Sequence, residues 1–358
     1  MESSILRRKS RAVRVGNITV GGDAPISVQS MTNTATHDRE ATLSQVNALA
    51  AAGVDIVRLA VPTEADAATF SYLKEQGVSV PLVADIHFDH RIALAAIAAG
   101  ADKIRINPGN IGSRDKVGEV VRACRTAGVP IRIGVNSGSL EKHILAKYGT
   151  PCAEALAESA LYHAQLLEEF DFYDTVLSVK ASSVREMLAA NRILAEKTDY
   201  PLHLGVTEAG GAHMGVIKSA VGIGACLAEG IGDTIRVSLT ADPVLEVKEA
   251  QAILSALDLN PTREMDIVSC PTCGRTRIDL IPLLAEFEDK LDQTGLRKKP
   301  LKVAFMGCVV NGPGEAREAD IGIAGGIDEG ILFKKGEILC RIPADRLVDE
   351  LIKEIERM

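Results

Sequence analysis

The chain has 358 residues, of which 46% are hydrophobic and 3% aromatic, and its formal net charge is −8. This length predicts about two domains, and the negative charge argues against a general nucleic-acid-binding role. The basic N-terminus precedes no apolar signal core, no run approaches the roughly 18 apolar residues of a membrane span, and the seven cysteines lack the spacing of a secreted disulfide scaffold, so we expect a cytoplasmic protein.

The first 258 residues repeat one pattern, in which a short β-branched run ends in polar residues and an Ala-rich helical stretch follows. Eight such runs occupy residues 26–31, 55–61, 81–87, 102–109, 130–137, 174–182, 201–210 and 233–240. The helical stretches 39–53 and 91–100 each end in Gly, the usual residue at a helix end. Eight βα units in about 240 residues predict a (β/α)8 TIM-type barrel rather than a doubly wound sheet. The earlier segment 12–22 is predicted to be a hairpin that precedes the barrel.

An arginine lies between apolar residues in three of these runs, at Arg105, Arg132 and Arg236. Side chains alternate between the two faces of a strand, so these arginines point into the barrel if their apolar neighbours face the helices. Other polar residues that share this parity or lie near a strand end are Asn107, Asn136, Ser238, Arg58 and Lys180. Unpaired buried cations are costly, so the barrel needs negative charge inside.

Interior carboxylates are one source of that charge, and Asp85 and Glu208 are available. Two acids balance five cations poorly, so a bound anion is the better explanation. The planar fork of Arg matches phosphate oxygens, and five cations suit a diphosphate better than a single phosphate. Active sites of such barrels lie at the carboxyl ends of the strands, and the glycines of segment 107–113 offer backbone N–H groups there.

Further polar residues are expected at the ends of the strands. They are Asp85, His87, His203, Thr207 and Glu208. Glu208 has the strongest case for a functional role, because "TEAGG" exposes its carboxylate on a glycine-rich turn at the barrel mouth.

The last hundred residues leave the barrel pattern after a linker at 256–264 and predict a small α+β domain, residues 259–358. Cys270 and Cys273 form a C-x2-C pair, and 34 residues separate the pair from Cys308. These cysteines lie where predicted strands end. Three cysteines so placed point to a metal or redox site.

Three kinds of site compete for these cysteines. Structural zinc needs a fourth ligand, either Cys340 or a carboxylate, although Cys340 is expected to be a small core residue. A thioredoxin-like dithiol leaves Cys308 unexplained. An iron–sulfur cluster accepts three thiolates and one different ligand, and Glu315 follows Cys308 with six residues between them.

The motifs "VQSMTNT", "RINPGN", "RIGVNSGS", "VKAS", "GVTEAGG", "SCPTCGR" and "GCVVNGPGEA" span nearly the whole chain. Together they resemble the bacterial 4-hydroxy-3-methylbut-2-enyl diphosphate synthase family of the methylerythritol phosphate isoprenoid pathway. The resemblance implies reductive ring opening of 2-C-methyl-D-erythritol 2,4-cyclodiphosphate with loss of water. It also implies one 4Fe–4S cluster per chain and a flavodoxin or ferredoxin as electron donor.

The resemblance assigns roles to individual residues. Cys270, Cys273, Cys308 and Glu315 match the cluster ligands, and Glu208 and Glu315 are the expected catalytic residues. Arg58, Arg105, Arg132, Asn136 and Lys180 match the family's diphosphate-binding positions. The polar residues of the strand pattern complete the expected substrate-binding set, namely Asp85, His87, Asn107, His203, Thr207, Arg236 and Ser238, together with Asn311 of the last motif.

The family also implies a homodimer in which the cluster domain of one subunit covers the barrel of the other. The rival interpretations are an anion-binding barrel with a structural zinc domain and a pterin-binding type of barrel that transfers a one-carbon unit.

Overall fold

The computed structural model describes residues 5–260, 264–308, 316–326 and 329–358. The chain divides into two compact units, Met1–Asn260 and Pro261–Met358. No helix of the described ranges is long and apolar enough to cross a membrane.

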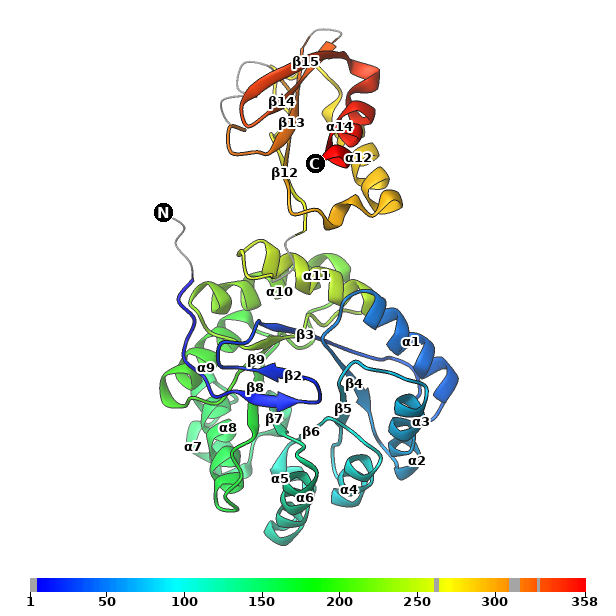
Figure 1. Ribbon diagram of the computed structural model, residues 1–358. Helices are drawn as coiled ribbons and strands as arrows, with labels where there is room; N and C mark the ends of the chain where they lie inside the picture. Colours follow the sequence, from blue (N-terminus) through cyan, green and yellow to red (C-terminus); the bar gives the residue numbers. More distant parts are fainter. Residues whose placement is uncertain (1–4, 261–263, 309–315, 327–328) are drawn as a thin grey trace. The chain divides into compact units, whose positions relative to one another are not determined.

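The first unit contains a sheet of eight parallel strands within the described residues. They are β3 (Ser27–Met31), β4 (Ile56–Ala60), β5 (Leu82–Asp85), β6 (Lys103–Ile106), β7 (Ile131–Asn136), β8 (Thr175–Lys180), β9 (His203–Leu204) and β10 (Thr234–Ile235). The order β8-β7-β6-β5-β4-β3-β10-β9 follows the chain around a ring, and the parallel bridge Leu177↔Leu202 links its two ends. The predicted (β/α)8 barrel is therefore confirmed (Figure 1).

Helices surround this barrel and cover the outer side chains of the strands (Figure 1). They are α1 (Arg39–Ala51), α2 (Glu64–Ala67), α3 (Thr69–Glu75), α4 (His90–Ala98), α5 (Pro108–Ile111), α6 (Arg114–Ala127), α7 (Lys142–Tyr148), α8 (Ala153–Glu168), α9 (Val184–Lys197), α10 (Ala212–Ala228) and α11 (Pro243–Ser255), with a 3-10 turn at Ser137–Ser139. The Asp38 side chain caps α1 by accepting a hydrogen bond from the Ala41 N–H. The predicted Gly stops are confirmed, since Gly53 and Gly100 have φ values of +85° and +93°.

An antiparallel hairpin, β1 (Val13–Val15) and β2 (Ile18–Val20), precedes the barrel as predicted. Val13, Val15 and Val20 are buried with the inner side chains near the starts of three strands, Ile56, Val83 and Val176. Burial of this apolar cluster closes the amino end of the barrel. The carboxyl ends of the strands are left as the functional face.

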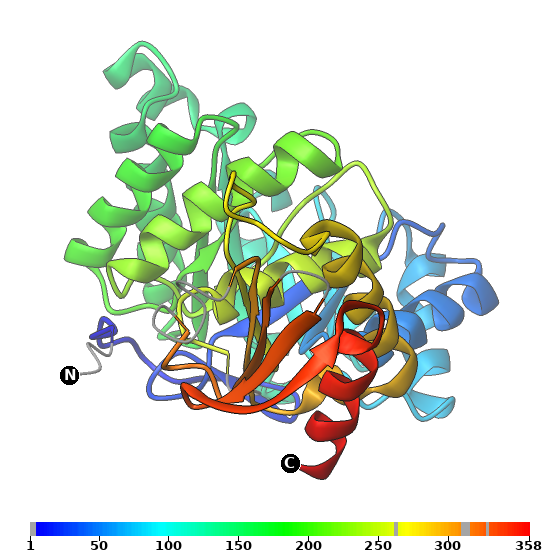
Figure 2. The ribbon, with the colours of Figure 1, turned by 90° about the horizontal axis from the view of Figure 1, so that it is seen from above.

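The second unit is a mixed five-stranded sheet within the described residues, in the order β11-β12-β13-β14-β15. Its elements are β11 (Asp266–Ser269), α12 (Leu280–Thr294), a 3-10 turn (Leu296–Lys298), β12 (Lys302–Met306), β13 (Ile321–Gly325), β14 (Glu329–Lys334), β15 (Glu337–Pro343), a 3-10 turn (Ala344–Arg346) and α14 (Leu347–Arg357). Both helices pack on the same face of the sheet (Figure 2), where the rings of Phe287 and Phe305 lie 4.8 Å apart.

The core position expected for Cys340 is wrong. Cys340 lies on β15 at the edge of the sheet, where Ile342 is the buried side chain. A register irregularity opposite Leu332 and Phe333 interrupts the alternation in this strand, so Ile338 is 60% exposed.

Candidate functional site

Six basic side chains lie on inner positions of the barrel strands, or directly after a strand in the case of Arg236, in the described part of the chain. They are Arg58, Lys103, Arg105, Arg132, Lys180 and Arg236. Five of them are the cations expected from the strand pattern, and Lys103 was missed. Its signal was the same parity, because Lys103 lies two residues before Arg105 in β6.

Asp85 is the central acid of this group. Its Oδ2 lies 2.5 Å from Nη2 of Arg58, and its Oδ1 lies 3.1 Å from Nη1 of Arg105. Burial by itself would raise the pKa of Asp85, but the charges of the two arginines outweigh burial and hold this pKa well below its usual range. Asp85 is therefore an ionised carboxylate that holds two guanidinium groups in place.

The second interior acid is Glu246, not Glu208 as the sequence suggested. Glu246 Oε2 accepts a hydrogen bond from Arg236 Nε at 3.3 Å, and the Glu246 side chain is 4% exposed. Its signal in the sequence is a carboxylate on the buried face of helix α11, among Pro243, Val247 and Ala250. Residue Glu208 is exposed.

Basic groups outnumber the acids in the barrel. Among the described residues, Asp85 and Glu246 are the two carboxylates paired with these six basic side chains. In the same described ranges Nζ of Lys103 and two guanidinium nitrogens of Arg132 have no hydrogen-bond partner. Burial lowers the pKa of both side chains, and neighbouring positive charges lower it further. A ligand with several negative charges would relieve this imbalance.

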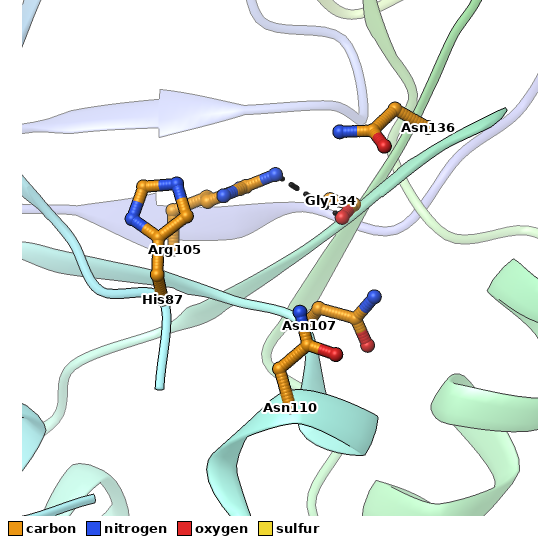
Figure 3. A pocket seen from close by; sticks show the side chains of 6 residues that line it. All are labelled: His87, Arg105, Asn107, Asn110, Gly134 and Asn136. Atoms are coloured by element: carbon orange, nitrogen blue, oxygen red, sulfur yellow. Dashed lines mark hydrogen bonds between the residues drawn. The ribbon is translucent and has the colours of Figure 1, made fainter. Parts of the chain in front are cut away.

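A pocket of about 140 Å³ opens beside these groups at the carboxyl ends of β5 to β7. It is lined by His87, Arg105, Asn107, Asn110, Gly134 and Asn136. In Figure 3 the His87 ring lies beside the Arg105 guanidinium, and the three amides border the same space. This mixture of cation and amide groups suits phosphate oxygens.

Glycine at position 134 makes room for Arg105. A Cβ atom there would lie 2.3 Å from Nε of Arg105, while the Arg105 Nη2 donates to the Gly134 carbonyl at 3.2 Å. Gly205 plays a similar role, since its Cβ would lie 2.7 Å from Nζ of Lys180. Gly134 and Gly205 therefore leave the space that the side chains of Arg105 and Lys180 occupy above the neighbouring segments of the barrel.

The remaining predicted barrel residues lie at two depths. Thr207 and Ser238 are half-buried and follow β9 and β10. The expected position of His203 at a strand end is wrong, because β9 begins with His203. This side chain is fully buried, with Nδ1 3.4 Å from Oγ1 of Thr234, and burial together with nearby cations lowers the pKa of His203 well below its ordinary value.

Glu208 lies on a strained turn after β9. Its φ is +53°, in the left-handed region that non-glycine residues seldom occupy. Gly210 in the same turn has a φ of +109°, and its carbonyl accepts a hydrogen bond from the Thr240 N–H at 3.0 Å. The turn holds an exposed carboxylate, and such strain is common at functional sites.

In the second unit, Cys270 and Cys308 follow the ends of adjacent parallel strands, because Ser269 of β11 pairs with Phe305 of β12. The Gly307 N–H donates to the Cys270 Sγ at 3.1 Å. Cys273 is exposed, and hydrogen bonds from Arg275 lower its pKa, which favours the thiolate.

All seven cysteines are free. Within the described ranges, no three His, Cys, Asp or Glu side chains are grouped as metal ligands. Two members of the predicted site, Asn311 and Glu315, lie outside the described residues.

Comparison with known proteins supports the motif-based interpretation. The chain matches the GcpE TIM-barrel domain over residues 10–251 and the GcpE protein C-terminal domain over residues 266–357. The chain belongs to the GcpE family. A GcpE relative from Clostridium perfringens is 58% identical, with 98% of this chain and 99% of the relative covered. Another, from Geobacillus thermodenitrificans, is 55% identical, with 100% and 94% covered.

Both GcpE relatives are named 4-hydroxy-3-methylbut-2-en-1-yl diphosphate synthase (flavodoxin). The family resemblance drawn from the motifs is therefore confirmed.

Two solved structures share the fold of about 70% of this chain. A type I 3-dehydroquinate dehydratase from Clostridium difficile covers 70% of this chain and 98% of its own, with a TM-score of 0.51 and 18% identity. A dihydropteroate synthase from Yersinia pestis covers 69% and 98%, with a TM-score of 0.50 and 15% identity. At such identities the likeness shows the barrel fold and gives no support to a pterin-dependent activity.

Proposed function

We propose that this chain is an oxidoreductase that forms 4-hydroxy-3-methylbut-2-en-1-yl diphosphate, the product for which its GcpE relatives are named. The substrate is 2-C-methyl-D-erythritol 2,4-cyclodiphosphate. The observation that carries the proposal is the charge inside the barrel, where six basic side chains face two paired carboxylates among the described residues. A cyclic diphosphate supplies the negative charge that this interior lacks.

The barrel residues bind and orient the diphosphate. Arg58 and Arg105, held by Asp85, present their guanidinium groups toward it, and Arg132, Lys180 and Arg236 add further positive charge. The amides that line the pocket with Arg105 fix the orientation of the phosphate oxygens. Reductive ring opening takes up two electrons and one proton and releases water, so the diphosphate gains one negative charge. The surplus of cations stabilises this added charge.

Glu208 is proposed to move a proton during the loss of water. Its carboxylate is exposed on the turn after β9, at the carboxyl end of the barrel. This end carries the catalytic groups in barrels of this type.

The second unit is proposed to hold a 4Fe–4S cluster on Cys270, Cys273, Cys308 and Glu315. The donor set fits, because two of the thiols follow adjacent strand ends and the third favours its thiolate. The Gly307 N–H also donates to the Cys270 sulfur, as backbone groups near cluster thiolates do. When bound, the cluster would pass electrons to the substrate from a flavodoxin, the donor in the relatives' name.

The active form is proposed to be a cytoplasmic homodimer in which the barrel of one subunit works with the cysteines of the other. Free cysteines in both units suit a reducing compartment.

The decisive experiment is turnover of the cyclic diphosphate by air-free protein with a reduced flavodoxin, together with iron and sulfide analysis. We expect product formation and about four iron atoms and four sulfides per chain. Protein without flavodoxin is the control. Binding of the cyclic diphosphate without turnover, combined with stoichiometric zinc and no labile sulfide, would instead identify an anion-binding barrel with a structural zinc domain.

A further inference from the structure

Glu246 accepts hydrogen bonds from two separate segments of the barrel unit, strand β3 and the stretch after β10. Its Oε2 accepts from Ser30 Oγ on β3 at 3.0 Å and from Arg236 Nε at 3.3 Å. Its Oε1 accepts from Arg236 Nη2 at 3.4 Å and from the Leu239 backbone N–H at 3.0 Å. Four donor groups thus converge on one buried carboxylate.

These contacts orient the Arg236 guanidinium. Nε and Nη2 face the two oxygens of Glu246, and Nη1 lies 3.4 Å from Sδ of Met31. A planar guanidinium that is hydrogen-bonded through Nε and Nη2 holds its remaining N–H groups in a fixed direction. Burial lowers the pKa of Arg236, and the neighbouring Glu246 carboxylate opposes that effect.

We infer that Glu246 is a positioning residue for the diphosphate, acting through Arg236 from helix α11. The inference rests on the proposed function, because it assigns Glu246 a part in binding the same cyclic diphosphate. The loop after β10 links Glu246 to the turn that carries Glu208. The Leu239 N–H donates a hydrogen bond to Glu246, and the N–H of the next residue, Thr240, donates to the Gly210 carbonyl in that turn.

The charge of Glu246 allows two explanations of its effect to be told apart. A carboxylate near a diphosphate repels it. If this charge repulsion were the whole effect of Glu246, Glu246→Gln would tighten binding of the diphosphate. If Glu246 positions Arg236, the same change releases the guanidinium and weakens binding, although the site becomes more positive. The two explanations predict opposite signs.

The test measures the Kd of the cyclic diphosphate by calorimetry with air-free, full-length protein. We expect Glu246→Gln to weaken binding by about 10- to 100-fold, and we expect no further loss when it is added to Arg236→Met. The matched control is Glu249→Gln on the same helix, which should leave the Kd unchanged.

Ser30→Ala is a gentler variant that keeps every charge and removes one hydrogen bond to Glu246. It should weaken binding by a few-fold in the parent and leave the Kd of Arg236→Met unchanged. Circular dichroism and the thermal midpoint verify folding of each variant.

Unchanged or tighter binding in Glu246→Gln, or an equal loss in the Arg236→Met background, overturns the inference. Should Glu246→Gln fail to fold, an unchanged Kd in Ser30→Ala overturns it. Failure of the proposed function has a different appearance, because the parent protein would then not turn over the cyclic diphosphate, whether or not it binds it.

Discussion

Lys103 lies fully buried on the inner face of β6, and its Nζ has no hydrogen-bond partner among the described residues. Such a group costs folding free energy, because the folded protein replaces none of the hydrogen bonds that the amine makes to water in the unfolded chain. The position is paired in register with Val83 of β5, an apolar residue. An apolar side chain of similar length can therefore replace Lys103 beside Val83.

Lys103→Met should raise the free energy of unfolding by about 1–3 kcal/mol, since it removes the unpaired amine and keeps the volume of the side chain. Urea denaturation of parent and variant measures the difference. Lys218→Met, on the outer helix α10, is the control and should change stability by less than about 0.5 kcal/mol. A destabilised Lys103→Met protein would show that the amine has a stabilising partner.

The same residue makes stability depend on pH. Burial lowers the pKa of Lys103 well below its ordinary value, so between that lowered pKa and about 10.4 the unfolded chain binds a proton that the folded chain does not. Stability contributed by this group therefore rises with pH across the window. The increase in the free energy of unfolding between pH 7 and 9, measured by urea denaturation, should be smaller in Lys103→Met than in the parent. Equal increases in the two proteins would contradict the lowered pKa of Lys103.

Strand β7 presents Gly134 directly under the Arg105 side chain. Gly134→Ala should weaken binding of the cyclic diphosphate by about 10- to 100-fold, because the new Cβ, 2.3 Å from the present Nε position, forces the guanidinium to move. Calorimetry with the cyclic diphosphate measures this change. Gly224→Ala, on helix α10 where a Cβ meets nothing within 4 Å, should leave the affinity unchanged. Unchanged affinity in Gly134→Ala would show that Arg105 does not contact the ligand.

The ends of β11 and β12 carry the proposed cluster ligands. Cys308→Ser should lose the cluster or leave it defective, because one of three thiolates is removed. Iron and sulfide analysis of air-free protein checks this. Cys340→Ser on the exposed edge strand β15 is the matched control and should keep a full complement. Loss of iron in Cys340→Ser with retention in Cys308→Ser would reverse the ligand assignment.

Much of the barrel was predictable because its strands are short, β-branched and end at polar residues or Gly. Inward-facing Arg105 and Arg132 followed from strand parity alone, and the two are paired across β6 and β7. Strand length was harder to predict. The run 201–210 contains only two residues of strand, since the extent of β9 depends on its neighbours, and His203 consequently lies deep in the barrel.

Partners from other elements could not be predicted from a local pattern. Glu246 reaches Arg236 from a helix, and the sequence pointed instead to Glu208 because a carboxylate on a glycine-rich turn is a familiar signal. Cys340 keeps the strand parity of the buried Ile342 but is exposed on the edge strand β15, and the alternation pattern does not reveal which strand lies at the edge. Both errors concern contacts that only the folded chain creates.

At the scale of the whole molecule, the proposed shared site predicts complementation between subunits. The linker expected at 256–264 spans at most about 30 Å when fully extended, and a helix on the outside of the barrel precedes it. Two-fold pairing is the commonest symmetric arrangement and would bring the cysteines of one chain to the barrel of another.

Mixing inactive Glu208→Gln with inactive Cys308→Ser protein should restore part of the activity. A mixed dimer has one intact site, made from the barrel of the Cys308→Ser chain and the cysteines of the Glu208→Gln chain. The measurement is turnover of the cyclic diphosphate after subunit exchange, with exchange followed by an affinity tag on one variant. A double variant mixed with itself is the control. Absence of recovery despite demonstrated exchange would mean that each chain builds its own site.

The β1–β2 hairpin closes one end of the barrel with Val13, Val15 and Val20 packed on the first inner layer of strand residues. In the described part of the chain, the closed amino end leaves the carboxyl end of the barrel, where the pocket lies, as the way in for reactants. Product must leave before the next substrate molecule can bind, and both use the carboxyl end of the barrel. We therefore expect the product to inhibit competitively with the cyclic diphosphate, because both would enter and leave at the same end of the barrel.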